Sequence, residues 1–194
     1  MCGIIAAASN RNVGKLLVQG LHKMEYRGYD SAGIALHQDN QIAHLRTLGK
    51  VKLLEDKMIS EKPKSKLGIA HTRWATHGEP SEENAHPHKS NERVYIVHNG
   101  IIENYLDLKE FLKKEGYKFS SQTDSELIAH MLEHFLAKGN SMLDSMYLTK
   151  EKLDGAYAIA AIDKEDDKNI IIARNKSPLL IGIGTDEFLA ASDP

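Results

Sequence analysis

The chain of 194 residues contains a single cysteine, at position 2. One cysteine excludes an internal disulfide, so the fold must be held by its apolar core. No apolar run approaches the roughly 20 residues that a membrane-spanning helix needs, and no basic segment followed by a long apolar one stands at the N-terminus. The sequence therefore predicts a cytoplasmic protein without a membrane anchor or a secretion signal.

An excess of one charge is also missing, because 25 basic and 27 acidic residues leave a net charge of -2. Such a balance offers no general attraction for nucleic acid or for an anionic membrane surface, so neither is predicted as a partner. Aromatic residues make up only 6% of the chain, and its one tryptophan is Trp74. With 41% hydrophobic residues, the length suits one domain with a full core and is short for two. We expect a single domain over residues 1–194.

The spacing of apolar residues predicts strands at both ends of the chain and helices between them. Strands are expected at 1–9, 31–36, 41–48, 67–72, 93–98, 156–162, 170–173, 179–183 and 188–191, and helices at 13–24, 105–112, 127–135 and 142–153. A long loop is expected over residues 73–90, and a turn at Asn99-Gly100. This order excludes regular alternation of strand and helix and favours an α+β fold with a largely antiparallel sheet.

The position of Cys2 gives it a special chemistry if Met1 is removed. The residue then carries a thiol, with a pKa of about 8.5, and an α-amine, with a pKa of about 7.7 to 8.0. Moving the proton from sulfur to nitrogen costs only about 1 kcal/mol, so the amine can generate the attacking thiolate. If Met1 is retained, the Cys2 nitrogen is a peptide amide without basicity. On position alone, Cys2 also fits a small apolar side chain that opens a buried strand.

Five short blocks stand out along the chain: Cys2-Gly3-Ile4-Ile5, residues 25–33 (EYRGYDSAG), residues 71–78 (HTRWATHG), residues 98–104 (HNGIIEN) and Thr123-Asp124. In this order they strongly resemble the glutaminase domain of the class II glutamine amidotransferases, and among these the branch that carries a sugar-phosphate isomerase domain. The resemblance implies an N-terminal-nucleophile hydrolase fold. That fold is a four-layer αββα sandwich of two mainly antiparallel sheets. The resemblance also implies glutamine as the substrate and no cofactor.

The resemblance assigns catalytic roles to four residues. Cys2 is the nucleophile, and the side chain of Asn99 and the backbone N–H of Gly100 stabilise the tetrahedral oxyanion, a contribution of several kcal/mol in such reactions. Taken in isolation, the Asn-Gly pair would be read as a plain turn. Arg27 is implied to help position Cys2, with positive charge that lowers the pKa of the thiol. An ion pair at the surface is the other interpretation of Arg27.

Five further residues are implied to bind glutamine. The planar guanidinium of Arg73 suits the α-carboxylate, and the carboxylate of Asp124 suits the α-ammonium. Asp124 also precedes a predicted helix in a pattern typical of a helix cap, and both roles are compatible. Trp74, Thr76 and His77 lie on the loop that closes over bound glutamine in the family. Trp74 would otherwise simply anchor that loop.

A zinc signature also occurs in the sequence, but the helix that carries it has another explanation. Residues 130–134 (HMLEH) match H-x-x-E-H on a predicted helix, with both histidines on one face. The apolar stripe of the same helix already explains it, and ten histidines in the chain make such a match easy by chance. The histidines at 86 and 88 have no cysteine partners with which to complete a closed site. No metal site is predicted.

The predicted function is hydrolysis of glutamine to glutamate and ammonia through a γ-glutamyl thioester on Cys2. A chain that keeps Met1 would instead be a glutamine-binding or docking module without turnover. One position departs from the resemblance, because Gln122 stands where the family commonly has Glu. The sugar-phosphate isomerase domain is implied as a partner in the same full-length enzyme, which we expect to form a homo-oligomer. The chain ends directly after an apolar run, so we expect it to be a piece of that longer protein.

Overall fold

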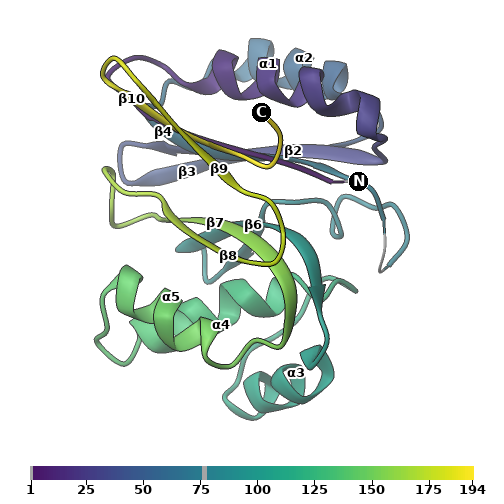
Figure 1. Ribbon diagram of the computed structural model, residues 1–194, viewed down its shortest axis with the longest axis vertical. Coiled ribbons are helices and arrows are strands. Elements are labelled where there is room, and N and C mark those ends of the chain that lie inside the picture. Colours follow the sequence, from purple (N-terminus) through teal and green to yellow (C-terminus); the bar gives the residue numbers. More distant parts are fainter. Residues whose placement is uncertain (1, 76–77) are drawn as a thin grey trace.

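Two β-sheets lie face to face, with helices on both outer sides, in the computed structural model, which describes residues 2–75 and 78–194 (Figure 1). The elements follow the chain as β1 (Gly3–Ser9), α1 (Gly14–Met24), the 3₁₀ turn η1 (Glu25–Arg27), β2 (Ser31–Gln38), β3 (Gln41–Leu48), α2 (Val51–Glu61), β4 (Leu67–Arg73), β5 (His88–Ser90), β6 (Val94–Ile102), α3 (Tyr105–Lys114), α4 (Glu126–Leu136), α5 (Met142–Lys150), β7 (Gly155–Asp163), β8 (Ile171–Asn175), β9 (Leu180–Gly184) and β10 (Glu187–Ala191). The predicted α+β class is confirmed.

The larger sheet has the strand order β3-β2-β4-β1-β10-β9, and the smaller one has the order β5-β6-β7-β8. Within the described part of the chain, neighbouring strands of both sheets pair antiparallel. Strand β1 lies in the interior of the larger sheet, with β4 on one side and β10 on the other. Cys2 immediately precedes this strand, whose first residue, Gly3, pairs with Thr72 of β4.

Three apolar clusters fill the spaces between the four layers. Leu17 and Leu21 of α1 pack on the outer face of the larger sheet. Ile4 and Val97 lie between the two sheets, and Leu132 of α4 packs on the smaller sheet. Interior strands such as β1 are therefore covered on both faces, which explains why β1 is almost continuously apolar rather than alternating, whereas the edge strand β9 is exposed. This is the four-layer αββα sandwich that the resemblance implied.

One α-helix and one strand were not predicted from the sequence. Helix α2 buries only Val51 and Leu54, so the apolar period that marks an amphipathic helix is weak. Strand β5 occupies the end of the predicted loop at 73–90, and its three residues are too few to show an alternating pattern. The loop also starts one residue later than predicted, because Arg73 is the last residue of β4.

The predicted turn at Asn99-Gly100 is wrong. Both residues lie inside β6, with Asn99 opposite Ala158 and Gly100 opposite Tyr157 of β7. Gly100 has a φ of +132°, a value that residues with a side chain rarely adopt. The strand therefore continues through this position because a glycine stands there, and it ends at Ile102.

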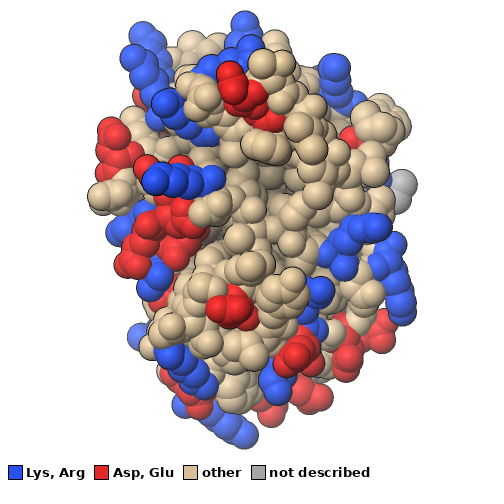
Figure 2. Space-filling view, turned by 60° about the vertical axis from the view of Figure 1, so that its left-hand side comes forward, with Lys and Arg blue, Asp and Glu red and all other residues tan. Residues whose placement is uncertain are grey.

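The distribution of basic and acidic side chains on the surface agrees with the small net charge of the chain. In the face shown in Figure 2, basic and acidic side chains gather toward the edges of the view, around a central area of other residues. Among the described residues, no helix is both long enough and apolar enough to span a lipid bilayer.

Candidate active site

The thiol of Cys2 lies against the peptide group of Trp74. The Trp74 N–H donates to the sulfur at 3.2 Å, and the thiol lies 3.4 Å from the Trp74 carbonyl oxygen, to which it donates. This contact follows from the sheet, because β1 and β4 run antiparallel and Gly3 lies opposite Thr72. The residue before β1 therefore meets the residue after β4. Cys2 is half-buried and reachable from solvent.

Asn99 reaches the same point from the smaller sheet. Its Nδ2 donates to the backbone carbonyl of Cys2 at 3.2 Å. Gly100, the next residue, is exposed. Two sheets thus bring together a thiol, an amide NH₂ and an exposed glycine backbone, which are the groups that amide hydrolysis through an oxyanion requires. The oxyanion roles of Asn99 and Gly100 stay predictions.

Arg73 is held by the carboxylate of Asp30, a residue for which the sequence predicts no role. The guanidinium is buried; its Nη1 lies 3.4 Å from the Asp30 carboxylate, and its Nη2 donates to the Gly78 carbonyl at 3.1 Å. Asp30 also accepts a hydrogen bond from the backbone N–H of Ala75. One carboxylate therefore fixes both the predicted carboxylate-binding cation and the start of the loop after β4. The only sequence signal was that Asp30 belongs to the block at residues 25–33.

Asp124 is buried at the end of β6. Its Oδ2 accepts a hydrogen bond from the backbone N–H of Ile102 at 2.8 Å, and the Ser125 hydroxyl lies 3.3 Å from Oδ1. The predicted helix cap is wrong, because α4 begins at Glu126 and Ser125 occupies the capping position without a side-chain cap. The carboxylate faces β6, the strand that carries Asn99. The predicted role in binding the ammonium group stays open to test.

Arg27 contacts the C-terminal segment. Its Nη1 donates to the carbonyl of Ser192 at 3.4 Å and lies 3.7 Å from the Asp193 carboxylate. Ser192 is itself paired with the backbone of Ile4, so Arg27 lies beside the beginning of β1. An ion pair is thus present, as in the alternative interpretation, but it is not a surface pair, because the Arg27 side chain is only 10% exposed. The positioning of Cys2 by Arg27 stays a prediction.

Trp74 is half-exposed and lies over Gly28. A Cβ added at Gly28 would lie 2.1 Å from the indole ring, so only glycine permits this contact. The indole therefore rests on the block at residues 25–33 instead of entering a core. Thr76 and His77, which were predicted to bind glutamine with it, lie outside the described residues.

Gln122 ties the segment that carries Asp124 to the loop after β4. Its backbone N–H donates to Asn84 Oδ1 at 2.9 Å, and Asn84 Nδ2 donates back to Gln122 Oε1 at 3.2 Å. The same oxygen also accepts from the backbone N–H of Glu79 at 3.4 Å. A neutral amide serves as the acceptor here, so the departure from the family's Glu leaves the segments joined.

The histidines of the zinc signature have different neighbours. His130 Nδ1 bonds the Ser90 hydroxyl at 2.8 Å, and its Nε2 lies 3.6 Å from Glu126. His134 Nδ1 lies 3.7 Å from Glu115. Across residues 2–75 and 78–194, no group of three or more potential ligands has the arrangement of a metal site.

The protonation of Cys2 depends on burial, on the N–H of Trp74 and on three charges, of which the positive charge of the N-terminus lowers the pKa of the thiol. Burial raises the pKa of the Cys2 thiol, and the negative charge of Asp30 raises it further. The N–H of Trp74 and the positive charge of Arg73 act in the opposite direction but do not outweigh burial. The thiolate is therefore a minor species near neutral pH, so an adjacent base is needed to generate it.

Substitution of Asp30 by asparagine should make the thiol more reactive. Loss of the negative charge lowers the pKa of Cys2, so at about pH 8 a larger fraction is thiolate and alkylation by iodoacetamide is faster. The measurement is the alkylation rate against pH for the parent and for Asp30→Asn, with the exposed Asp56→Asn as a control. Identical rate profiles for the parent and Asp30→Asn would show that the charge of Asp30 does not reach the sulfur.

The same variant should bind glutamine less well. Without the Asp30 carboxylate, the guanidinium of Arg73 loses one of the contacts that hold it in the position from which it is proposed to bind a carboxylate. We expect KM for glutamine to rise about tenfold, the size of one lost charge-assisted hydrogen bond. Steady-state kinetics of Asp30→Asn and Asp56→Asn test this, and an unchanged KM in Asp30→Asn would contradict it.

The fold and the site define a class: a cysteine immediately before an interior strand of a two-sheet sandwich is the arrangement of N-terminal-nucleophile amidotransferases. A family model described as a glutamine amidotransferase domain matches residues 71–194, more than half of the chain. The chain therefore belongs to the glutamine amidotransferase family, as the five sequence blocks predicted.

Curated relatives of the chain belong to one group within this class. The chain is 51% identical over 195 residues to glutamine--fructose-6-phosphate aminotransferase [isomerizing] of Haemophilus influenzae, and 50% identical over 194 residues to the protein of that name from Vibrio cholerae. Each alignment covers 100% of this chain and 32% of the relative. The chain thus spans about a third of the length of these curated relatives.

Solved structures agree with the fold. The glutamine phosphoribosylpyrophosphate amidotransferase of Bacillus subtilis, solved with ADP and GMP, matches with a TM-score of 0.85 at 26% identity, over 98% of this chain and 42% of that one. A glutamine aminotransferase class-II domain protein from Silicibacter pomeroyi matches with a TM-score of 0.61 at 11% identity, covering 100% of this chain and 89% of that one. The second likeness concerns the fold alone.

Proposed function

We propose that this chain hydrolyses glutamine and that it is the ammonia-supplying domain of a longer aminotransferase. The observation that carries the proposal is the meeting of Cys2 with Asn99 from the opposite sheet, at 3.2 Å between the Asn99 amide nitrogen and the Cys2 carbonyl oxygen. A structural cysteine at the start of a strand would not need an amide donor and an exposed glycine backbone beside it. Membership of the glutamine amidotransferase family supports the same reaction.

Removal of Met1 precedes the reaction and leaves a free α-amine on Cys2. The amine takes the thiol proton, and the thiolate attacks the amide carbon of the glutamine side chain to form a tetrahedral oxyanion. Asn99 Nδ2 and the Gly100 N–H stabilise this charge. The carbon–nitrogen bond then breaks, the α-ammonium returns the proton to the leaving ammonia, and a γ-glutamyl thioester remains. Water activated by the same amine releases glutamate and restores the thiol.

Two residues that bind the α-carboxylate and the α-ammonium of glutamine make the site selective for this amino acid. Arg73 binds the α-carboxylate and Asp124 the α-ammonium, because both are buried and carry the opposite charge. Trp74, Thr76 and His77 cover the bound amino acid and exclude water from the thioester until ammonia has left. Arg27 fixes the beginning of β1 and with it the position of the sulfur.

The length of the relatives supports a further domain in the same full-length chain. We propose that this is a sugar-phosphate isomerase domain that receives the ammonia and uses it to convert fructose 6-phosphate to glucosamine 6-phosphate. Assembly of the full enzyme into a homo-oligomer stays a prediction, to be tested by its mass in solution.

The proposal is tested with two forms of the chain that differ only at the N-terminus. Intact mass distinguishes the form that starts at Cys2 from a form in which Met1 is retained. The processed form is expected to convert glutamine to equal amounts of glutamate and ammonia without any sugar phosphate, whereas the Met1-bearing form is expected to be inactive. Equal activity in the two forms would exclude the α-amine as the base.

A further inference from the structure

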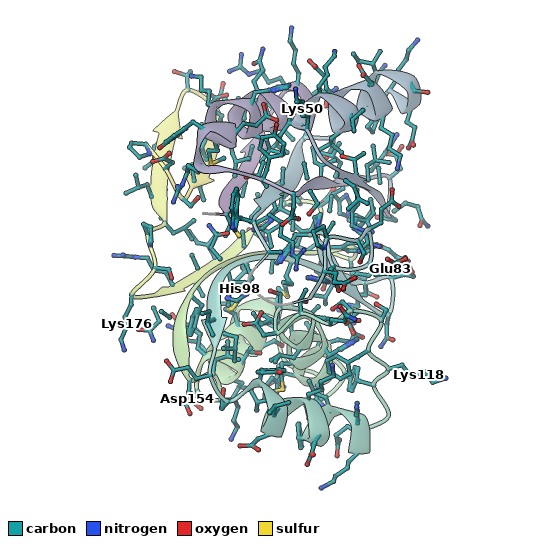
Figure 3. All side chains as sticks on the ribbon, turned by 90° about the vertical axis from the view of Figure 1, so that its right-hand side faces the viewer. Lys50, Glu83, His98, Lys118, Asp154 and Lys176 are labelled. Atoms are coloured by element: carbon teal, nitrogen blue, oxygen red, sulfur yellow. The ribbon has the colours of Figure 1, made fainter. Side chains whose placement is uncertain are left out.

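The side chain of Asn99 is hydrogen-bonded to a histidine that has no role in the proposed mechanism. His71 of β4 is 1% exposed, and its Nε2 lies 2.9 Å from Asn99 Oδ1 and 3.1 Å from the carbonyl oxygen of His98. In Figure 3, His98 lies in the interior, about halfway between the helices at the top and those at the bottom. The strand that carries Arg73 therefore also holds the proposed oxyanion donor on the other sheet.

The two partners of His71 determine the orientation of the Asn99 amide. A backbone carbonyl only accepts, so the His71 Nε2 facing the His98 oxygen must carry the hydrogen. A donor at Nε2 in turn requires that Asn99 present its oxygen, because an NH₂ group there would place two donors against each other. The NH₂ group of Asn99 must then point away from His71, toward Cys2, where it donates at 3.2 Å.

The other side of the His71 ring keeps this tautomer in place. Among the described residues, Nδ1 has no hydrogen-bond partner. The ring stacks on His86 with 4.1 Å between centroids and 24° between planes, and His86 Nδ1 accepts from the backbone N–H of His98 at 3.3 Å. Burial lowers the pKa of His71 to about 3, so the ring stays neutral with its one hydrogen on Nε2 at physiological pH.

We infer that His71 is a positioning residue for glutamine hydrolysis, which fixes the Asn99 amide with its NH₂ group directed at the oxyanion. The inference rests on the proposed function. Among the described residues, the hydrogen bonds of His71 go to Asn99 and to the His98 carbonyl, and none goes to Cys2, so we place its effect on the reaction in Asn99. Because an oxyanion donor stabilises the transition state more than the ground state, loss of its orientation lowers kcat and leaves KM nearly unchanged.

The test is a double-mutant cycle in the processed chain. His71→Phe keeps the ring and its stacking but removes the donor, and Asn99→Ala removes the group that His71 holds. In the parent background, His71→Phe is expected to lower kcat roughly tenfold to a hundredfold, with KM changed by less than about twofold. In the Asn99→Ala background it is expected to cause no further loss, since no amide is left to orient.

Two additional variants separate positioning from stability. His71→Gln places an amide donor near the same oxygen and is expected to recover part of the kcat lost in His71→Phe. His37→Phe is the matched control, because His37 is also buried and bonds a backbone carbonyl, that of Lys164 at 2.8 Å, away from Cys2. It is expected to keep the parental kcat.

The outcomes of these experiments distinguish the role of His71 from the proposed glutaminase function. Equal losses from His71→Phe with and without Asn99, or no loss of kcat in the parent background, would overturn the inference while the proposed function stands. Full activity in both Cys2→Ala and Asn99→Ala would instead overturn the proposed function. If His71→Phe does not fold, ¹⁵N NMR of the parent chain replaces the cycle. A neutral His71 ring with the hydrogen on Nε2 is expected, and a hydrogen on Nδ1 would overturn the inference.

Discussion

Replacement of Cys2 by alanine is expected to reduce glutamine hydrolysis by at least about a thousandfold, because the reaction loses its nucleophile and not merely a stabilising contact. The fold should be unaffected. The Cys2 side chain contacts only the peptide of Trp74 among its described hydrogen-bond partners, and the interior position of β1 is held by β4 and β10. The measurement is glutamate release by purified parent and variant, each with its N-terminal mass determined.

Two comparisons make the Cys2 experiment decisive. Cys2→Ser keeps a hydroxyl and the α-amine, but a hydroxyl is much harder to deprotonate than a thiol, so only a small residual activity is expected. Glutamine should still raise the thermal midpoint of Cys2→Ala, because the groups proposed to bind its two ends are intact. Retention of parental activity in Cys2→Ala would exclude the cysteine as the nucleophile.

Replacement of Gly100 by alanine is expected to have the second large effect, on both stability and activity. A Cβ at this position would lie 1.9 Å from the carbonyl oxygen of Ala156 on β7, and φ is +132°. Backbone strain of about 1 to 3 kcal/mol and a clash of similar size should lower the free energy of unfolding by roughly 2 to 6 kcal/mol. Denaturant unfolding measures this loss, and glutaminase assays should show that the remaining folded protein has lost most of its activity.

Gly116 provides the matched control for this substitution. Its φ is also positive, at +94°, but nothing lies within 4 Å of an added Cβ. Gly116→Ala should therefore cost only about 1 to 2 kcal/mol from the backbone conformation and should leave kcat unchanged. If the two alanine variants lost the same stability, the close approach of β6 to β7 at Gly100 would not be the constraint that we describe.

The position of Cys2 at the N-terminus marked it for attention, but its role and those of Arg73 and Trp74 were implied by the resemblance of whole sequence blocks. These roles stay predictions. The two-sheet architecture followed from the resemblance, whereas periodicity alone gave only an α+β fold. Strand β1 was predictable because burial on both faces makes it uniformly apolar.

The sequence could not predict the contacts that cross between elements. Asp30 holds Arg73 only because the end of β4 lies beside the start of β2. His71 holds Asn99 only because the two sheets are stacked. The Asn-Gly pair has the local preferences of a turn, and these are overridden by the pairing of β6 with β7 over its whole length. Asp124 was expected both to cap a helix and to bind the α-ammonium; it does not cap α4, and its Oδ2 accepts instead from the backbone N–H of Ile102, a contact with another element that the local sequence does not show.

The central claim is that the sulfur of the processed N-terminal cysteine carries the γ-glutamyl group. The most direct measurement treats the processed chain with a glutamine analogue that bears an electrophile at the γ-carbon, and follows the mass of the N-terminal peptide together with activity. We predict that one adduct forms on Cys2, that glutaminase activity falls in proportion to it, and that glutamine slows both changes. Full modification of Cys2 with undiminished glutaminase activity would contradict the account.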